Sequence, residues 1–274
     1  MKFEHSIALH NGVKMPQLGI GVWRVSPEDG VDAVRTAIEV GYRHIDTAAV
    51  YQNEEQVGEA IRQSGVSRDE LFITTKVWNA DQGYDTTLKA HEESLKKLGL
   101  DYVDLYLIHW PVKEKYLDTY KALERLYDEK LVPAIGVSNF HVHHLEDIAA
   151  HRNIKPMVDQ VELHPMFQQN ELHEYCHKNG IALEAWSPLM QGGEALTNPV
   201  IKEIADQYGK STAQVIIRWH LQRDVIVIPK SITPSRIQEN FEVFNFELSS
   251  NDMQQIATLD ANKRVGPDPD NFDF

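Results

Sequence analysis

Short apolar runs recur along the whole chain, and each run is followed by a segment with helical periodicity. The runs are near-continuous and rich in β-branched residues, a pattern typical of parallel strands that are buried on both faces. They occupy residues 17–21, 43–46, 71–77, 103–110, 132–139, 157–161, 181–187 and 225–229. Eight strand–helix units predict an α/β fold, a closed (β/α)8 (TIM) barrel that forms a single domain over residues 1–274.

The segments between the runs carry helix signals. Ser26 is an N-cap candidate for the first helix, and Gly41 is placed to end it. Residues 212–222 predict an extra helix before the last strand, and a C-terminal helix is expected to begin after Ser249. The dipeptide NG at residues 11–12, between two β-like runs, predicts a short N-terminal hairpin.

An open, doubly wound sheet is the alternative α/β fold. Such a sheet needs a glycine-rich first turn of the form GxGxxG. The sequence GIGVWR at residues 19–24 has arginine in place of the last glycine, and the barrel is therefore favoured.

Charge and cysteine content narrow the classes of partner. The formal net charge is −14, from 27 basic and 41 acidic residues, which argues against nucleic acids and anionic membranes as partners. The single cysteine, Cys176, excludes an intrachain disulfide and fits a reducing compartment. No apolar stretch approaches the length of a membrane span, and the N-terminus lacks the pattern of a signal peptide. We therefore expect a cytoplasmic monomer that acts on a small molecule.

Polar residues end three neighbouring strands of the predicted barrel, on the face where such barrels carry their chemistry. Asp46, Lys76 and His109 end the second, third and fourth strands, and Tyr51 follows in the loop after the second. Each could be structural alone: a helix cap, a strand-end charge or a core histidine. Together they predict a general acid. Lys76 is expected to lower the pKa of Tyr51, with Asp46 holding Lys76 and His109 orienting a carbonyl oxygen.

Aromatic residues surround the same face. Trp23, Trp78, Trp110 and Trp186 lie at or just past strand ends, whereas Trp219 lies within a helix. Four indoles at one rim predict a flat apolar pocket. We expect Trp23, Trp78, Trp110 and His109 to contact the substrate.

The motifs around these residues resemble the aldo-keto reductase family. They are GYRHIDTAAVYQNEEQVGEAI, ITTKVW, DYVDLYLIHWP, AIGVSNF, QVELHP and IPKS followed by RIQEN, and they occur in order over nearly the whole chain. The segment EAWSPLMQGG and the short tail resemble the bacterial branch that reduces diketo-gluconate and glyoxal-type dicarbonyls. The resemblance implies NADPH-dependent reduction of aldehydes and ketones on a TIM barrel, with no metal.

The resemblance also implies roles for individual residues. The catalytic tetrad falls on Asp46, Tyr51, Lys76 and His109. Cofactor contacts fall on Ser138, Asn139 and Gln160 for the carboxamide, Trp186 for the nicotinamide ring, Ser187 and Leu189 for the pyrophosphate, Lys230, Ser231 and Arg236 for the 2′-phosphate, and Glu239 and Asn240 for the adenine. Many family members have tyrosine where this chain has Trp186.

The residue types and their positions also support a 2′-phosphate site, independently of the resemblance. Lys230 and Ser231 precede a helix expected to begin near Thr233, and Arg236 lies in its first turn. Backbone amides and the helix dipole favour a phosphate there. Two ordinary surface charges are the alternative interpretation.

The end of the chain departs from the larger members of the family. Those members carry long loops around the last helix, whereas this chain stops shortly after Arg264. We therefore expect that side of the substrate pocket to be open.

Two histidine-rich motifs allow other functions. HEYCH at residues 173–177 matches the HExxH signature of zinc hydrolases, although Leu183 stands where a longer form of the motif places its third ligand. HVHH at residues 141–144 is either a metal patch or the start of a helix with exposed histidines, and we favour the helix. A cofactor-sensing subunit without catalysis is a third class, which a turnover assay would distinguish.

Overall fold

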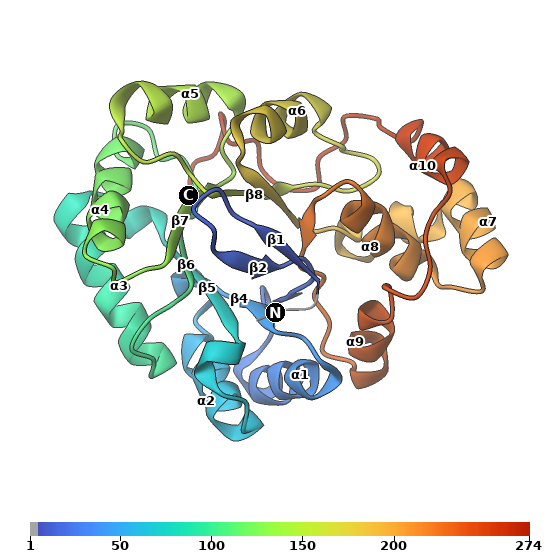
Figure 1. Cartoon of the computed structure of the whole chain (residues 1–274), viewed down its shortest axis with the longest axis horizontal. Helices are drawn as coiled ribbons and strands as arrows, with labels where there is room; N and C mark the ends of the chain where they lie inside the picture. The colour runs from blue at the N-terminus through green and yellow to red at the C-terminus, as the bar shows by residue number, and fades with distance from the viewer. Residues whose placement is uncertain (1–4) are drawn as a thin grey trace.

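The N-terminal hairpin is present as expected. The structure is a computed structural model that describes residues 5–274. Strands β1 (Ser6–Ala8) and β2 (Lys14–Pro16) pair antiparallel. Gly12 in the turn has a φ of +88°, which glycine adopts without steric cost. The hairpin lies across the barrel strands in the view of Figure 1, and Met15 joins the hydrophobic core.

The eight strands expected from the apolar runs form one parallel sheet in sequence order. They are β3 (Ile20–Gly21), β4 (His44–Asp46), β5 (Phe72–Val77), β6 (Leu105–Ile108), β7 (Ala134–Ser138), β8 (Val158–Glu162), β9 (Ala182–Trp186) and β10 (Ile226–Val227). Backbone bonds from Gly19 N to Val227 O and from Val227 N to Gln17 O, each 2.9 Å, join the last strand to the first. This closure confirms the (β/α)8 barrel and excludes the open sheet.

Helices surround the barrel (Figure 1). They are α1 (Pro27–Val40), α2 (Glu54–Ser64), α3 (Tyr84–Leu98), α4 (Tyr116–Asp128), α5 (Val142–His151), α6 (Asn170–Asn179), α7 (Pro199–Tyr208), α8 (Thr212–Gln222), α9 (Pro234–Phe241) and α10 (Ser250–Ala257). The Ser26 hydroxyl accepts a hydrogen bond from the backbone N–H of Asp29, as its predicted capping role requires. The extra helix before the last strand is α8, and Ser249 caps α10 through the N–H of Asp252.

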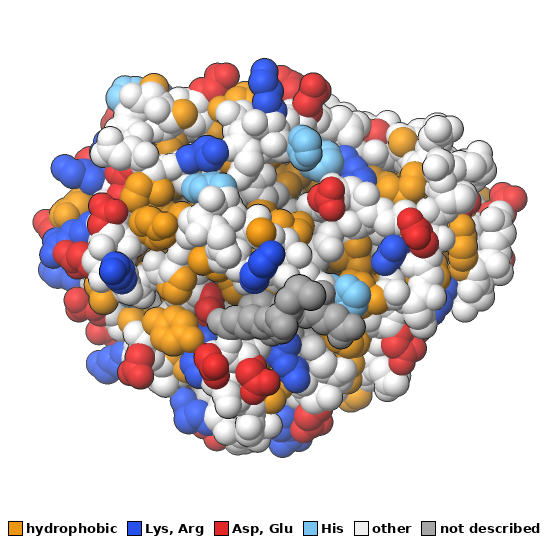
Figure 2. All heavy atoms as spheres, viewed as in Figure 1, with side chains coloured by type: hydrophobic (Ala, Val, Ile, Leu, Met, Phe, Trp, Pro, Cys, Tyr) orange, Lys and Arg blue, Asp and Glu red, His pale blue; other side chains and the backbone are white. Residues whose placement is uncertain are grey.

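The surface carries charges of both signs. Figure 2 shows acidic and basic side chains interspersed over the face that bears the hairpin. Within residues 5–274, no helix combines the length and apolar character that a bilayer-spanning segment requires.

The interior of the barrel contains a polar group among its apolar strands. His44, Asp46, Lys76, Gln160 and Glu184 are all buried, and they come from four strands of the barrel. Buried charges are tolerated when they are paired and hydrogen-bonded. The contacts of these five side chains therefore define the candidate site.

Candidate active site

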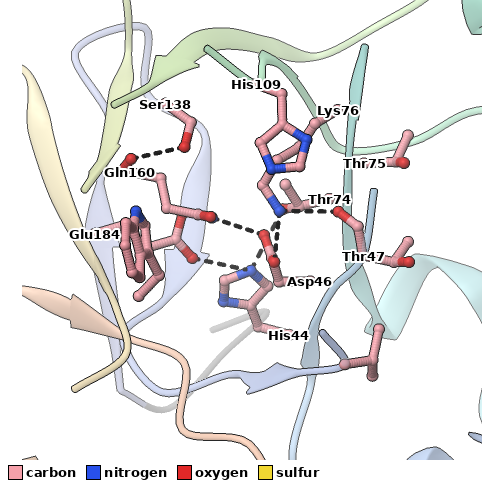
Figure 3. A network of polar contacts seen from close by, with 12 residues as sticks. His44, Asp46, Thr47, Thr74, Thr75, Lys76, His109, Ser138, Gln160 and Glu184 are labelled. Carbon is pink, nitrogen blue, oxygen red and sulfur yellow. Dashed lines mark hydrogen bonds and ion pairs between the residues drawn. The ribbon is translucent and has the colours of Figure 1, made fainter. Parts of the chain in front are cut away.

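A buried ion pair lies at the centre of the site. The Nζ of Lys76, on β5, donates to Asp46 Oδ1 at 2.6 Å and to the Thr47 carbonyl at 2.9 Å (Figure 3). The side chains of Lys76 and Asp46 are 0% and 2% exposed. Asp46 ends β4, next to β5 in the sheet, so the parallel register brings both side chains to the same end of the barrel. The carboxylate holds the ammonium in one position.

Tyr51 and His109 complete a compact group around this pair. Tyr51 ends the 3-10 helix η1 (Ala49–Tyr51) after β4, and the Lys76 Nζ is 5.2 Å from the centre of its ring. The imidazole of His109, just past β6, meets the Tyr51 ring edge-on at 5.6 Å between centroids. The structure thus brings together all four residues that the sequence singled out for catalysis.

The electrostatics of Tyr51 correct one expectation. Burial raises the pKa of Tyr51 above its ordinary value of 10, and the charge of Lys76 opposes this rise without reversing it. Lys76 therefore acts in the predicted direction, but the net shift of the Tyr51 pKa is upward because burial outweighs it. A phenol removed from water resists ionisation more strongly than one nearby ammonium favours it. Tyr51 keeps its proton at neutral pH.

The neighbouring groups have fixed protonation states. Burial alone would lower the pKa of Lys76, but Asp46 and Tyr51 raise it above its ordinary value, so the amine is charged. Burial and the charge of Lys76 hold the pKa of His109 well below its usual range, so the imidazole is neutral. Lys76 therefore places a positive charge beside Tyr51, whereas His109 places a neutral polar ring there.

A second layer of polar residues lies beneath the ion pair, and the sequence analysis did not identify it as a unit. The side-chain amide of Gln160 donates to Asp46 Oδ2 at 2.7 Å and to Glu184 Oε2 at 2.9 Å. His44 Nε2 lies 3.5 Å from Glu184 Oε1 (Figure 3). Burial, followed by the charge of Asp46, raises the pKa of Glu184, and burial lowers that of His44 to about 3. The signal in the sequence that could have indicated this layer is a single glutamate, Glu184, within the apolar run IALEAWS.

The predicted carboxamide and ring contacts lie on neighbouring strands, with Ser138 at the end of β7, Gln160 within β8 and Trp186 at the end of β9. The Ser138 hydroxyl donates to the Gln160 carbonyl at 2.8 Å. Asn139 has a φ of +65°, a conformation that asparagine tolerates better than most residues. Its amide donates to the His109 carbonyl, and its oxygen accepts from the Trp186 indole N–H, both at 2.9 Å. These bonds fix the plane of Trp186.

The predicted phosphate contacts lie farther along the chain. Ser187, with a φ of +48°, and Leu189 follow β9. Lys230 and Arg236 are exposed around the start of α9, and within residues 5–274 neither makes a salt bridge. The N-cap residue Thr233 makes no side-chain hydrogen bond to the helix. Ser231, Glu239 and Asn240 belong to the same segment, with Asn240 buried.

The C-terminal tail contradicts the expected open pocket. The backbone N–H groups of Val265 and Gly266 donate to the Glu162 carboxylate at 2.6 and 2.9 Å, which anchors the start of the tail at the end of β8. A Cβ added to Gly266 would lie 2.4 Å from the Trp186 ring, so only glycine allows this approach. The tail therefore crosses the rim beside Trp186.

The last residues of the tail pack on the predicted aromatic rim. Phe274 stacks on Trp78 at 5.9 Å and meets Trp110 edge-on at 5.3 Å. Phe272 contacts Trp110 at 5.3 Å. The short tail thus supplies a wall on the side where the missing loops had suggested an opening.

The tryptophans do not all share this environment. Trp78 meets the His109 ring edge-on at 5.3 Å, which places it against the tetrad. Trp23 is 41% exposed, and the guanidinium of Arg24 lies 4.1 Å from its ring centre. Trp219 is buried within α8, as its mid-helix position indicated. Trp78, Trp110 and Trp186 are therefore the indoles closest to the candidate chemistry.

The geometry of HEYCH does not support the zinc hydrolase alternative. His173 Nε2 lies 3.0 Å from the carbonyl of Arg223. In the part of the chain that the structure describes, no set of three ligand atoms within 4.8 Å of one another includes His173 or His177. The motif forms one turn of α6, which ends at Gly180.

The fold and the site together define a class of enzyme. It is a (β/α)8 barrel in which a protonated tyrosine, a neutral histidine and a buried lysine–aspartate pair gather at the strand ends. Residues 15–261 match the model of the aldo/keto reductase family. The chain belongs to this family, and it is an oxidoreductase that acts on carbonyl groups.

Named relatives cover almost the whole chain. A 9,11-endoperoxide prostaglandin H2 reductase of Trypanosoma cruzi is 58% identical over 271 residues, which are 97% of this chain and 95% of that protein. A glyoxal reductase of Bacillus subtilis is 57% identical over 270 residues, 98% of each protein. A crystal structure of a Gox0644 mutant in complex with NADPH superposes with a TM-score of 0.95 at 45% identity, covering 99% of each chain.

Proposed function

We propose that this protein uses NADPH to reduce small, reactive aldehydes and ketones to alcohols, with Tyr51 as the general acid. The observation that carries this proposal is the buried Lys76–Asp46 pair beside a protonated Tyr51 and a neutral His109. The Asp46 carboxylate and the Thr47 carbonyl offset the cost of burying the Lys76 ammonium. A buried cation beside a protonated phenol at the strand ends is the arrangement that a general acid of this kind needs.

The four residues divide the work on the carbonyl oxygen. NADPH held at this site would supply a hydride to the carbonyl carbon. Tyr51 transfers its proton to the oxygen, so that the C=O bond becomes an alcohol and the phenol becomes a phenolate. The ammonium of Lys76 stabilises this phenolate, and Asp46 keeps the ammonium in place. The neutral imidazole of His109 orients the carbonyl by a hydrogen bond without competing as an acid.

Residues on β7, β8 and β9, and Asn139 just after β7, fit a nicotinamide. The amide nitrogen of Gln160 is committed to two carboxyl groups, which leaves its oxygen as the acceptor for a carboxamide N–H. Ser138 and Asn139 lie beside it, and the fixed indole of Trp186 offers a flat face for stacking. Ser187 and Leu189 would contact the pyrophosphate, and Glu239 and Asn240 the adenine.

The cofactor preference rests on the cations around the start of α9. Arg236→Ala should raise the dissociation constant of NADPH about 10-fold or more, because a hydrogen bond to a charged group contributes about 1.5–3 kcal/mol. Binding of NADH should hardly change, since NADH lacks the 2′-phosphate that Lys230, Ser231 and Arg236 would hold. Titration of tryptophan fluorescence with each cofactor measures both constants. Arg35→Ala, which removes a half-buried arginine from α1, is the control. Equal weakening for both cofactors would make Arg236 a structural residue.

The pocket walls favour small or flat substrates. Trp78 and Trp110 line one side, and Phe272 and Phe274 of the tail cover them. Few polar groups remain there to bind a large polar substrate. Because contacts far from the carbonyl would then contribute little energy to lower the barrier, carbonyls that are intrinsically reactive should be the best substrates. We therefore infer activity on glyoxal, methylglyoxal, aromatic aldehydes and short diketones.

Trp110→Ala tests this substrate class. The change should lower kcat/KM more for aromatic aldehydes than for glyoxal, because it loosens the aromatic wall that Trp110 forms with Phe272 and Phe274, and only an aromatic ring would bury much area against that wall. A panel of carbonyl substrates assayed with NADPH and NADH, for wild type and variant, measures the difference. Trp23→Ala is the comparison and should cost less, since Trp23 is exposed. Equal losses on both substrate types, or a strong preference for a bulky lipid such as a prostaglandin, would contradict this model of the pocket. Absence of turnover with every carbonyl would favour a binding subunit.

A further inference from the structure

Asp46 and Glu184 bring two carboxyl groups into the interior of the barrel, where Lys76 supplies the positive charge. The side-chain amide of Gln160 donates to both carboxyl groups, at 2.7 and 2.9 Å. The ammonium of Lys76 is 2.6 Å from Asp46 Oδ1. Within residues 5–274, no lysine or arginine nitrogen lies within 4.0 Å of a Glu184 oxygen. Among these residues, Lys76 therefore pairs with Asp46 and leaves Glu184 without a cation of its own.

The other neighbours of Glu184 do not supply a positive charge. His44 Nε2 lies 3.5 Å from Glu184 Oε1 (Figure 3). Burial and the charge of Lys76 lower the pKa of His44 to about 3, so its ring is neutral. On β10, the residue opposite Glu184 in the parallel register is the apolar Ile226. Within residues 5–274, the titratable side chains around Glu184 are thus His44, Asp46, Lys76 and Tyr51.

These contacts determine the protonation state of Glu184. A carboxylate removed from water is costly without a cation, and a second carboxylate nearby increases that cost. Burial, followed by the charge of Asp46, raises the pKa of Glu184 to about 8, so the side chain is mainly protonated at neutral pH. Oε2 accepts the bond from Gln160, and Oε1 has no hydrogen-bond partner in the described part of the chain. A proton on Oε1 would be directed at His44 Nε2.

We propose that Glu184 is a positioning residue for the reduction: as a neutral acid it holds Gln160 in place, and its ionisation weakens the site. This inference rests on the proposed function, in which Gln160 accepts a hydrogen bond from the carboxamide of NADPH. With Asp46 and Glu184 on its amide nitrogen, Gln160 cannot exchange nitrogen and oxygen without losing both bonds. Its oxygen is thereby kept for the cofactor.

Ionisation of Glu184 would act on the general acid through charge. A carboxylate at this position raises the pKa of Tyr51 and that of Lys76, because its negative field opposes the loss of either proton. The Tyr51 phenolate that forms on proton transfer would then be less stable, and the reduction would be slower. The protonated form of Glu184 is therefore the active one.

The dependence of activity on pH tests this role. In the wild type, kcat/KM for methylglyoxal should fall by up to about 10-fold between pH 7 and pH 9, the ratio of the protonated fractions of a group with a pKa of about 8. In Glu184→Gln, whose amide can accept from Gln160 and donate toward His44, this decline should disappear. Glu129→Gln, which removes an exposed carboxylate after α4, should retain it. A decline that persists in Glu184→Gln, or that is absent from the wild type, would overturn the inference.

Cofactor binding tests the contact with Gln160. Glu184→Ala removes one of the two groups that hold the amide, so the dissociation constants of NADPH and NADH should both rise several-fold. Glu184→Gln should restore most of this loss, because it can keep the bond. Titration of tryptophan fluorescence with each cofactor measures these constants. Binding to Glu184→Ala as tight as to the wild type, or no recovery in Glu184→Gln, would contradict the positioning role.

The protonation state has a readout that needs no turnover. Between the ordinary pKa of glutamate, about 4.3, and a pKa of about 8, the folded protein holds a proton on Glu184 that the unfolded chain has released. The stability of the wild type should therefore fall relative to that of Glu184→Gln as the pH rises from 5 to 8, which urea denaturation measures. The same dependence on pH in both proteins would overturn the neutral acid. A wild type that shows the difference and binds NADPH, yet reduces no carbonyl, would refute the proposed reaction and support the role of Glu184 in holding Gln160.

Discussion

Replacing Tyr51 with phenylalanine should lower kcat for carbonyl reduction by about 10²–10⁴-fold, the usual contribution of a positioned general acid. The phenol keeps its proton at neutral pH because burial raises its pKa, so the native enzyme holds the acid in its active form. The variant keeps the ring that packs against His109 but has no proton to give. Steady-state kinetics with methylglyoxal and NADPH measure the loss.

The Tyr51→Phe variant should bind NADPH almost normally, because the ring retains its shape. Tyr120→Phe is a matched control: Tyr120 is buried in α4, and its hydroxyl has no hydrogen-bond partner within residues 5–274. That substitution should leave kcat unchanged. Near-normal turnover in Tyr51→Phe would remove the tyrosine from the mechanism, whereas a parallel loss in Tyr120→Phe would point to a general defect in folding.

The sequence was sufficient to predict the barrel and the catalytic group because both depend on local pattern. Strands buried on both faces appear as apolar runs, and a polar residue at the end of such a run is conspicuous. Asp46, Lys76 and His109 could be recognised this way, since neighbouring parallel strands bring their carboxyl ends to one edge. The topology then followed from the order of the runs.

The sequence analysis missed features that depend on contacts between residues far apart in the chain. The tail closes one side of the pocket because Glu162 accepts two of its backbone N–H groups and because Gly266 passes close to Trp186. Neither contact has a signature in the sequence. The direction of the Tyr51 pKa shift was also inaccessible, since it depends on how far burial outweighs the charge of Lys76. The bridge from Gln160 to Glu184 requires the register of β8 and β9.

Lys76→Met should produce the largest loss of stability among these variants. It leaves the Asp46 carboxylate buried without its cation, and breaking a buried pair in this way typically costs about 3–5 kcal/mol. Urea denaturation of the wild type and the variant measures the difference. The deficit should shrink as the pH falls. Without Lys76, the pKa of buried Asp46 in the folded state lies still further above its unfolded value, so the folded state binds the additional proton.

The double variant Asp46→Asn, Lys76→Met separates stability from catalysis. With both charges removed, no uncompensated ion remains in the barrel, and most of the lost stability should return. Activity should stay as low as in Lys76→Met alone, because the ammonium that stabilises the Tyr51 phenolate is still absent. Asp46→Asn alone should weaken catalysis less than Lys76→Met, since Lys76 keeps its bond to the Thr47 carbonyl. A double variant that regained activity together with stability would show that the pair only supports the fold, and Lys76 would then have no role in the transfer of the proton.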